Sequence, residues 1–394
     1  MKNNKTQKNI PDGWQTNILG KIASITAGGT PSTKRNDYWD GEILWMNSGD
    51  LNKKIIYEVN GRITQLGLDL SSAKLIPINS VLIGLAGQGK TRGIVAVNKI
   101  ELSTNQSVAA IMPNDVINYN FLYFNLDRRY KELRQISAGD GGRGGLNLKL
   151  LNSLKIKFPP LPEQNRIVSV LETWDKAIEK LTKKIELKKN IKKGLMQRLL
   201  TGELRLPGFS EAWQAVNLSD VCKRIRTGKL DANAMVKGGK YRFYTCAKNY
   251  YRINDYAFDT EALLVSGNGA NVGYIHYYNG KFNAYQRTYV LDNFTSDITF
   301  TKYILDEHLH KRIFEEKCDG NTPYIKMDTL TDMKIKMPKT KEERAAIASV
   351  VVTADKEVAA LGQNLDILKE QKKYLLNNLI TGAIRTPETM KISI

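Results

Sequence analysis

Cysteine and histidine are both scarce in this sequence, with three of each in 394 residues. The cysteines are odd in number, widely spaced and free of any Cys-x-x-Cys pair, so the sequence predicts neither a disulfide framework nor a zinc knuckle. The histidines form no metal-ligand set either. We therefore expect no bound metal, and thiols that are buried in a protein of a reducing compartment.

Long hydrophobic runs are also absent. No stretch approaches the 18 apolar residues of a membrane-spanning helix. Residues 1–10 are polar and rich in lysine, without the apolar segment of a signal peptide, so we expect a disordered tail and a cytoplasmic protein. At 42% hydrophobic residues and a mean hydropathy of -0.37, the chain can still bury real cores.

Acidic residues are outnumbered by basic ones. Lys and Arg total 59 against 40 Asp and Glu, a net charge of +19, with a pI near 9.6. A surplus of this size indicates a polyanionic partner, nucleic acid before a membrane surface. The alternative is a basic surface with no partner.

A catalytic set of residues is missing as well, with one stretch to weigh. Residues Gly84–Thr91 satisfy the Walker A spacing, which would make the chain an ATP-dependent enzyme using Lys90. A P-loop must open a helix, whose N-terminal amides hold the phosphate. Here residues 92–97 alternate like a strand, and the related stretch at 266–271 has no lysine, so a glycine-rich hairpin is the better interpretation.

What the sequence does contain is a long heptad helix that occurs twice, from Gln164 to Leu200 and again 180 residues later. Apolar residues recur at alternating steps of four and three, which is the pattern of a coiled coil. Lys188 and Lys192 interrupt the first seam and Lys372 the second, and the pattern leaves their role open. The predicted seam consists of Ile167, Leu171, Trp174, Ile178, Leu181, Ile185, Leu195, Leu199, Ile347, Val351, Val358, Leu361, Leu365, Leu368, Leu375 and Leu379.

The globular segments before each helix are related too. Trp14 corresponds to Trp213, and Gln106 to Gln286, while Gly87-x-Gly89 aligns with Gly267-x-Gly269; the first segment carries roughly 19 extra residues between 28 and 87. Short β-branched runs such as 43–46, 54–59, 80–85 and 93–97 predict strands, and 119–136 predicts a helix. The expected organisation is a tail (1–10), a first domain (11–160), a helix (161–206), a second domain (207–340), a helix (341–386) and a tail (387–394).

This duplication predicts an α+β fold with two β-rich, mixed α/β domains. The second domain starts soon after the first helix and ends at the second, so we expect the helices to run antiparallel as an intramolecular coiled coil. That would separate two pseudo-twofold-related domains, an arrangement that suits duplex DNA.

Several turn-rich loops carry side chains that suit phosphates or base edges. For each one the alternative is a solvated surface loop. The candidate DNA-binding residues are Lys34, Arg35, Gln88, Lys90, Arg92, Gln106, Arg143, Asn268, Asn271, Gln286, Arg287 and Tyr324.

The whole pattern resembles the specificity subunits of Type I restriction–modification systems. The second copy has Lys339-Thr340-Lys341-Glu342-Glu343-Arg344 where Pro-Pro-Leu-Pro-Glu-Gln would stand. The resemblance rests on Trp14, Gly29-Thr30-Pro31-Ser32, Tyr38-Trp39, Ile43-Leu44-Trp45, Ser48-Gly49-Asp50-Leu51, Pro159-Pro160-Leu161-Pro162-Glu163-Gln164 and Leu200-Thr201-Gly202-Glu203-Leu204.

The resemblance implies two target recognition domains, each reading half of a split sequence in double-stranded DNA. The helices would set the spacer and dock two DNA methyltransferase (modification) subunits. Methylation and cleavage would belong to these and to the restriction/translocase subunits, together with S-adenosylmethionine, ATP and Mg²⁺. This chain would bind no cofactor and would not be an enzyme by itself. A non-specific coiled-coil scaffold stays open as an alternative.

Overall fold

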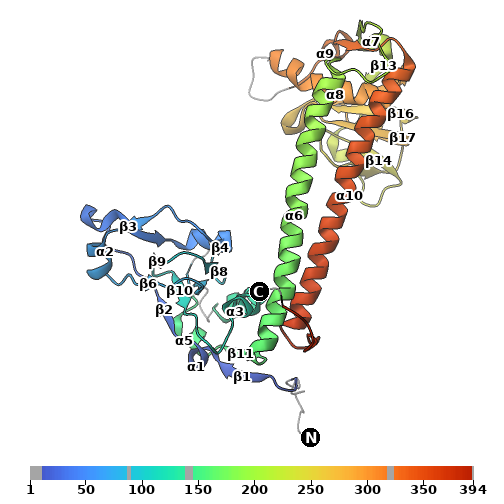
Figure 1. Cartoon of the computed structure of the whole chain (residues 1–394). Helices are drawn as coiled ribbons and strands as arrows, with labels where there is room; N and C mark the ends of the chain where they lie inside the picture. The colour runs from blue at the N-terminus through green and yellow to red at the C-terminus, as the bar shows by residue number, and fades with distance from the viewer. Residues whose placement is uncertain (1–10, 87–89, 138–144, 317–323, 393–394) are drawn as a thin grey trace. The chain divides into compact units, whose positions relative to one another are not determined.

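The computed structural model describes residues 11–86, 90–137, 145–316 and 324–392. The chain forms two compact units, residues 1–180 with 365–394 (unit 1) and residues 181–364 (unit 2). Each unit holds one β-rich domain and parts of both long helices, and each is described by itself (Figure 1).

The described part of unit 1 contains a two-stranded sheet (β1-β11), a five-stranded sheet (order β2-β10-β7-β8-β4) and a four-stranded sheet (order β5-β3-β9-β6). Strands β7, β8 and β10 are buried along their whole length, because one face packs on the core with α3 and the other on the core with β3. Their near-continuous Val, Ile, Leu and Ala composition follows from this two-sided burial. The strands are β1 (Gln15–Ile18), β2 (Ile25–Ala27), β3 (Trp39–Met46), β4 (Ile55–Ile56), β5 (Arg62–Ile63), β6 (Leu75–Ile76), β7 (Val81–Gly84), β8 (Val95–Asn98), β9 (Leu102–Thr104), β10 (Val108–Ile111) and β11 (Lys155–Phe158).

The helix predicted over 119–136 is two helices. Asn118 caps the first, its side chain accepting from the backbone N–H groups of Asn120 and Phe121. Arg129 leaves helical geometry (φ -90°, ψ 15°) and separates α3 from α4. The strand predicted over 54–59 is also shorter, since only β4 pairs there. The helices of the domain are α1 (Leu19–Ile22), α2 (Gln65–Asp69), α3 (Tyr119–Arg128), α4 (Tyr130–Ile136) and α5 (Leu148–Asn152), with 3-10 turns η1 (Asn36–Tyr38) and η2 (Ser48–Lys53).

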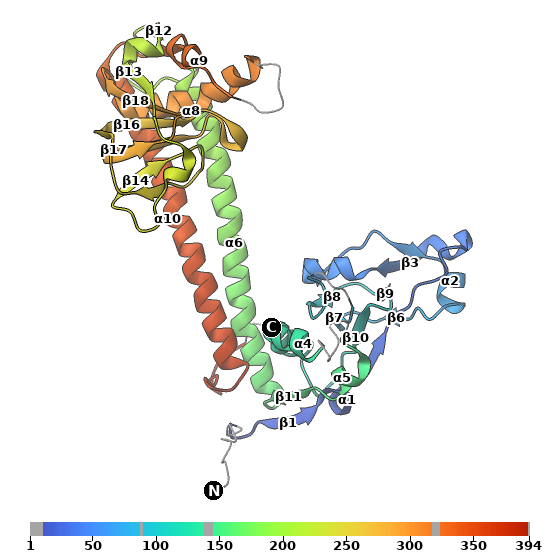
Figure 2. The same ribbon diagram turned by 180° about the vertical axis from the view of Figure 1, so that it is seen from behind.

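Unit 2 has a two-stranded sheet (β12-β19) and a six-stranded sheet, order β13-β18-β16-β17-β14-β15, within its described residues (Figure 2). The strands are β12 (Gln214–Asn217), β13 (Cys222–Thr227), β14 (Tyr241–Tyr244), β15 (Tyr251–Ile253), β16 (Phe258–Ser266), β17 (Ile275–Ala284), β18 (Thr288–Phe294) and β19 (Lys334–Met337). The helices are α7 (Leu218–Val221), α8 (Ile298–Glu315) and α9 (Met327–Thr331), with 3-10 turns η3 (Ala232–Ala234) and η4 (Gly269–Asn271).

The two domains share one topology. The order β2-β10-β7-β8-β4 recurs as β13-β18-β16-β17-β14, and the last pair is parallel in both. Gly28 and Gly228 mark the same place, because a Cβ would lie 2.1 Å from the Thr104 carbonyl oxygen in one and 1.9 Å from that of Ala284 in the other. The duplication and the α+β class are therefore as expected, and the extra residues of the first domain carry its four-stranded sheet.

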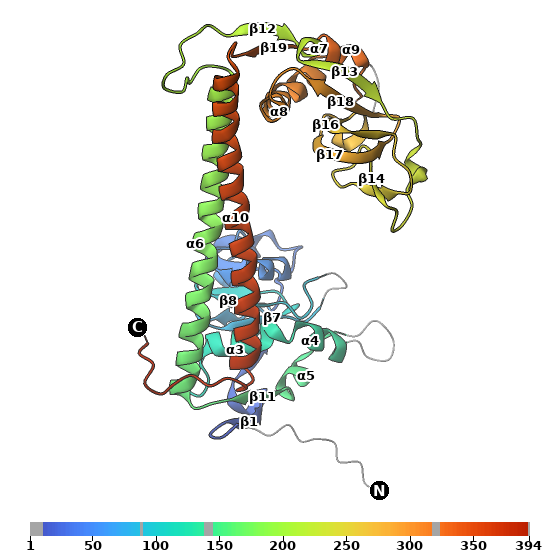
Figure 3. The ribbon, with the colours of Figure 1, turned by 90° about the vertical axis from the view of Figure 1, so that its right-hand side faces the viewer.

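The long helices are α6 (Leu161–Leu200) and α10 (Lys341–Leu379). In unit 1, Glu163 contacts Arg385 and Asp175 contacts Lys372; in unit 2, Lys188 contacts Glu357. Contacts that advance along one helix and retreat along the other mean that the segments pair antiparallel in each unit, as predicted (Figure 3).

The predicted seam faces inward throughout, although to different depths. Fully buried members sit near the domain cores, where they join those cores directly. The buried seam residues are Ile167, Leu171, Ile185, Leu199, Ile347, Val351 and Leu379. The half-buried ones are Trp174, Ile178, Leu181, Leu195, Val358, Leu361, Leu365, Leu368 and Leu375.

The lysines that interrupt the seam pair with carboxylates on the opposite helix. Lys372 Nζ lies 2.5 Å from Asp175 Oδ1, and Lys192 contacts Asp355 in the same way 180 residues apart. Lys188 adds a third pair, 2.7 Å from Glu357. A charged pair at a seam position tolerates few other registers, so these lysines fix the alignment of the helices.

Candidate nucleic-acid interface

The Walker-like stretch of unit 1 is a β-hairpin. Gly93 N–H donates to the Gly84 carbonyl (2.9 Å) and Gly84 N–H donates to that of Ile94 (3.0 Å), continuing the antiparallel β7–β8 ladder. The described residues of this stretch open no helix, so the geometry of a P-loop is missing and the ATP-site alternative is not supported. Gln88 lies outside the described residues.

Lys90 and Arg92 are held through their backbones by α4. Tyr130 donates its hydroxyl to the Lys90 carbonyl (3.0 Å), and Arg134 Nη1 donates to the Arg92 carbonyl (3.4 Å). Gly93 follows with φ +80°, a left-handed conformation that favours glycine. The Lys90 side chain is exposed and Arg92 is half-buried, so Lys90 is the better placed of the two to meet a ligand.

The glycine-rich loop after β2 is fixed in unit 1 by two indoles and one glutamine. Trp45 Nε1 donates to the Gly29 carbonyl (3.0 Å), and the hydroxyl of Thr30 donates to Gln106 Oε1. Gln286 plays the same part in unit 2, donating from Nε2 to Asp231 (2.7 Å) in the loop after β13. The two predicted glutamines are thus structural equivalents at the rim of each main sheet.

Lys34 and Arg35 follow that loop, and both are exposed. Arg35 is already paired, since its guanidinium donates to both oxygens of Asp37 (2.5 and 2.8 Å) and lies 4.7 Å from the ring centre of Tyr38. The hydrogen bonds to Asp37 raise the pKa of Arg35 and lower that of Asp37. Lys34 is therefore the stronger phosphate candidate.

The remaining candidates of unit 2 gather where β16 ends and β18 begins. Asn268 forms an isolated bridge with Tyr324, and Gly267 N–H donates to the Arg287 carbonyl (2.8 Å). Asn271 Nδ2 donates to the Cys246 carbonyl (3.0 Å), which links the cluster to the end of β14. In unit 1 the candidate Arg143 lies outside the described residues.

One predicted alignment needs correction. Leu85 N–H donates to the Ser107 carbonyl as Gly267 N–H donates to that of Arg287, so Leu85 is the counterpart of Gly267. The offset of 180 holds again at Gly93 and Gly273, whose φ angles are +80° and +81°. The loop of unit 1 is therefore two residues longer, and matching Gly87 with Gly267 was wrong.

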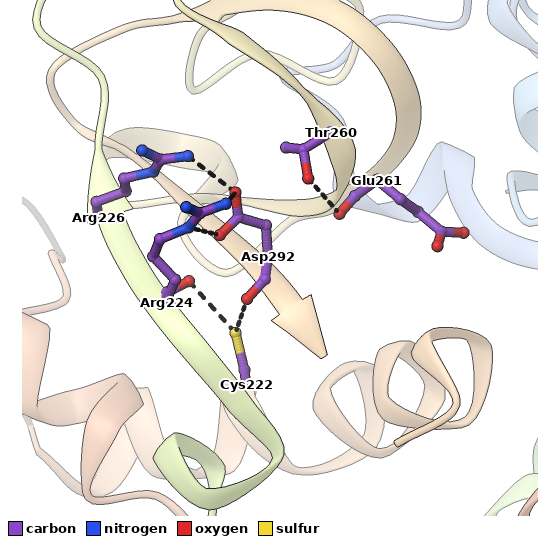
Figure 4. Close-up of polar contacts among 6 residues, drawn as sticks. All are labelled: Cys222, Arg224, Arg226, Thr260, Glu261 and Asp292. Atoms are coloured by element: carbon purple, nitrogen blue, oxygen red, sulfur yellow. Dashed lines mark hydrogen bonds and ion pairs between the residues drawn. The ribbon is translucent and has the colours of Figure 1, made fainter. Parts of the chain in front are cut away.

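Sequence patterns missed a buried carboxylate in the second domain. Asp292 is fully buried on β18 and accepts from Arg224 (2.6 and 2.9 Å) and Arg226 (2.9 Å) on β13 (Figure 4). Burial raises the pKa of the neighbouring Cys222 thiol to about 11. The available signal was the alternation of Arg224 and Arg226, which places both on one face of the strand.

The junctions between helix and domain repeat in detail. Glu343 at the start of α10 is buried and accepts from Arg205 Nε (2.8 Å) and Nη2 (2.9 Å). Glu163 at the start of α6 does the same with Arg385 (2.6 and 2.7 Å). The divergent junction sequence of the second copy therefore keeps the glutamate.

The residue after each glutamate also keeps its role. Gln164 donates to the Pro159 carbonyl (2.9 Å), and Arg344 donates to that of Pro338 (2.7 Å), so each caps the chain that enters the helix.

Beside each junction lies a cavity with a basic wall. In unit 1 it measures about 690 Å³, and Lys155 and Lys157 of β11 line it; in unit 2 it measures about 640 Å³, with Lys334 and Lys336 of β19. Equivalent strands build both cavities, so the pair belongs to the duplicated part of the fold.

Two further searches were confined to the described ranges. They contain no group of three or more His, Cys, Asp or Glu side chains able to hold a metal ion. None of their helices combines the length and hydrophobicity needed to cross a bilayer.

Comparison with known proteins defines the family. Residues 11–189 and 210–377 each match the Type I restriction modification DNA specificity domain. The chain therefore belongs to the family of Type I restriction–modification specificity proteins, with two specificity domains.

The similar proteins agree. The chain is 35% identical to the EcoDI specificity subunit of Escherichia coli over 175 residues, a match that spans 44% of this chain but only 38% of that subunit. It is 24% identical to the MjaIX specificity subunit of Methanocaldococcus jannaschii, over 96% of this chain and 95% of the other. Among solved structures, the S subunit from M. genitalium shares the fold, with a TM-score of 0.59 and 16% identity, over 95% of this chain and 97% of that one.

Proposed function

We propose that this chain is the DNA-recognition subunit of a Type I restriction–modification complex and is not catalytic by itself. Residues 11–160 and 207–340 are the two target recognition domains, and each reads one half of a bipartite sequence in double-stranded DNA. The proposed site of action is the cytoplasm, where that DNA is.

The observation that carries this proposal is the duplication with divergence of one part only. Both copies keep the junction glutamate, the seam lysine and the order of the main sheet. The loops at the rim differ, since Lys90 stands in one and Asn268 and Asn271 in the other. A common scaffold that presents different side chains twice suits two different half-targets.

The long helices are proposed to set the spacer and to dock two DNA methyltransferase subunits. Apolar side chains stand exposed away from the seam on both helices, among them Leu187 (59%) and Ile191 (54%) on α6, and Ile367 (54%) and Tyr374 (60%) on α10. Exposed apolar side chains in equivalent places support two copies of one partner. Methylation and cleavage would then belong to the methyltransferase and restriction/translocase subunits, with S-adenosylmethionine, ATP and Mg²⁺ bound there.

The direct test is the complex with its methyltransferase on DNA fragments from the host. Methylated adenines mapped across the genome should define one motif of two short blocks with a spacer of fixed length. Footprinting on that motif should protect both blocks and leave the spacer less protected. A single continuous footprint would contradict two readers, and equal affinity for random DNA would favour the scaffold.

A second test addresses docking. Leu187→Asp with Ile191→Asp should prevent co-elution with the methyltransferase, because it places charge in an apolar interface. Glu186→Asp, one residue away on an exposed position, is the matched control and should co-elute normally. Retained assembly of the double variant would remove this helix face from the proposed interface.

A further inference from the structure

The segment between the first strand of the main sheet and its central strand differs sharply in charge between the two domains. Residues 28–80 of the first domain carry six Lys and Arg and six Asp and Glu, which cancel. Residues 228–257 of the second carry six Lys and Arg and two Asp, six minus two giving +4, together with five tyrosines. The second domain thus interleaves cations and aromatic rings where the first builds a neutral extra sheet.

These side chains form one surface at the edge of the six-stranded sheet, on β14, β15 and β17. At its centre the Arg242 guanidinium carbon lies 4.3 Å from the ring centre of Tyr250 and 4.4 Å from that of Tyr278. Arg252 lies 5.5 Å from the Tyr250 ring, and Lys240 is exposed beside them. We name Lys240, Arg242, Tyr250, Arg252 and Tyr278 the Arg242 face.

Aromatic rings hold a cation differently from a carboxylate. A ring stacks on the flat face of a guanidinium, whose N–H donors lie in its plane and stay available for an oxyanion. Arg242 uses one such donor, Nη1, on the hydroxyl of Tyr244 (3.2 Å). Arg224, in contrast, spends its in-plane donors on Asp292.

The charge of this face is not balanced internally. Among the residues that the structure describes, no carboxylate lies within ion-pair distance of Lys240, Arg242 or Arg252. Three cations and exposed phenols without an acidic partner fit an anion with many oxygens, such as the phosphate backbone of DNA.

The face is also continuous with the predicted base-reading cluster. The end of β14 leads into Cys246, whose carbonyl accepts from Asn271 and whose thiol lies 3.4 Å from the Arg287 carbonyl. His276 Nε2 lies 2.9 Å from the carbonyl of Ala247. A duplex whose bases meet Asn271 and Arg287 therefore has its backbone near Tyr250.

On the basis of the proposed function, we propose that the Arg242 face binds phosphates of duplex DNA beside the half-target of the second domain. It supplies affinity and salt dependence, while the neighbouring loop cluster supplies sequence preference. The first domain, whose equivalent segment is neutral, contributes less of the phosphate binding.

The test uses the complex with the methyltransferase, a duplex with the bipartite motif and a duplex without it. In Lys240→Ala with Arg252→Ala, the slope of log Kobs against log salt should fall by about two, one per removed phosphate contact. Affinity should drop on both duplexes by a similar factor, and the methylated motif should stay the same. Hydroxyl-radical protection should weaken beside one half-target only.

The matched control is Lys223→Ala, an exposed lysine on β13 at the other edge of the same sheet, which should keep the wild-type slope. Tyr250→Leu, which removes the ring from Arg242 without touching a charge, should weaken binding in the same direction. An unchanged slope in the double variant overturns the proposal, as does loss of co-elution with the methyltransferase, which would make the face a protein contact. If the wild-type complex itself protects no bipartite motif, the proposed function has failed instead.

Discussion

Removing the charge of Glu343 should loosen the junction of unit 2 and leave unit 1 intact. The carboxylate is 2% exposed and accepts three hydrogen bonds, two from Arg205 and one from Trp213 Nε1 (3.2 Å). In Glu343→Gln the side chain keeps its size and one oxygen. The amide nitrogen, however, meets an arginine N–H, so one charge-assisted hydrogen bond is lost outright.

The size of the effect follows from that geometry. A hydrogen bond to a charged group contributes about 1.5–3 kcal/mol, and removing one partner of a buried ion pair costs about 3–5 kcal/mol. The Arg205 side chain is 26% exposed and can recover some hydration, which argues for the lower end. We expect about 2–3 kcal/mol, equivalent to roughly 30- to 150-fold faster exchange of amides that open with the junction.

Hydrogen exchange with peptide resolution is the suitable assay, because a chain of two units need not unfold in one step. Peptides over 199–213 and 341–351 should exchange faster, while the equivalent peptides of unit 1 should not change. The reciprocal variant Glu163→Gln should reverse the pattern. The neighbouring Glu342→Gln, at an exposed position, is the control. An effect below about 0.5 kcal/mol, or one spread equally over both units, would refute the assigned role.

Three further outcomes are expected. Asp355→Asn removes the charge that holds Lys192 and accepts from the hydroxyl of Tyr303 (2.6 Å), and should cost about 1–2 kcal/mol in the unfolding free energy of unit 2 by urea denaturation. Burial first, and then the hydrogen bond to Asp355, raise the pKa of Tyr303, so the unfolded phenol ionises first; stability should fall as pH rises above about 10, and less steeply in Tyr303→Phe. Because burial raises the pKa of Cys222 to about 11, iodoacetamide at pH 8 should alkylate the half-buried Cys246 and reach Cys222 only in urea, as peptide mass spectrometry would show.

Local patterns were sufficient for the frame of the molecule. The heptad seam and the offset of 180 identified both long helices, and the glycine after each, Gly202 and Gly382, has the left-handed φ (+76° and +74°) of a helix stop. Such signals lie within one element or in its repeat, so one sequence is enough to find them.

Contacts between elements were beyond those patterns. A heptad shows that Lys192 faces the other helix, but the residue opposite depends on the register, and Asp355 could not be named. Asp292 looks like a surface acid until the strand order places it against Arg224. The rings of Tyr250 and Tyr278 lie 28 residues apart in sequence and meet at Arg242 only because β14 pairs with both β15 and β17.

The duplication permits a comparison within one chain. Contacts that survive in both copies lie at the helix ends and along the seam, as Glu163 with Arg385 and Glu343 with Arg205 show. Contacts found in one copy only, such as those of Asp292 and Arg242, lie within the domains. A surface that must meet the same partner twice keeps its contacts, whereas a surface that must read two different sequences diverges. The same division should hold under substitution: changes at the junctions should affect assembly at their own end, and changes on the domain face should affect DNA binding while assembly persists.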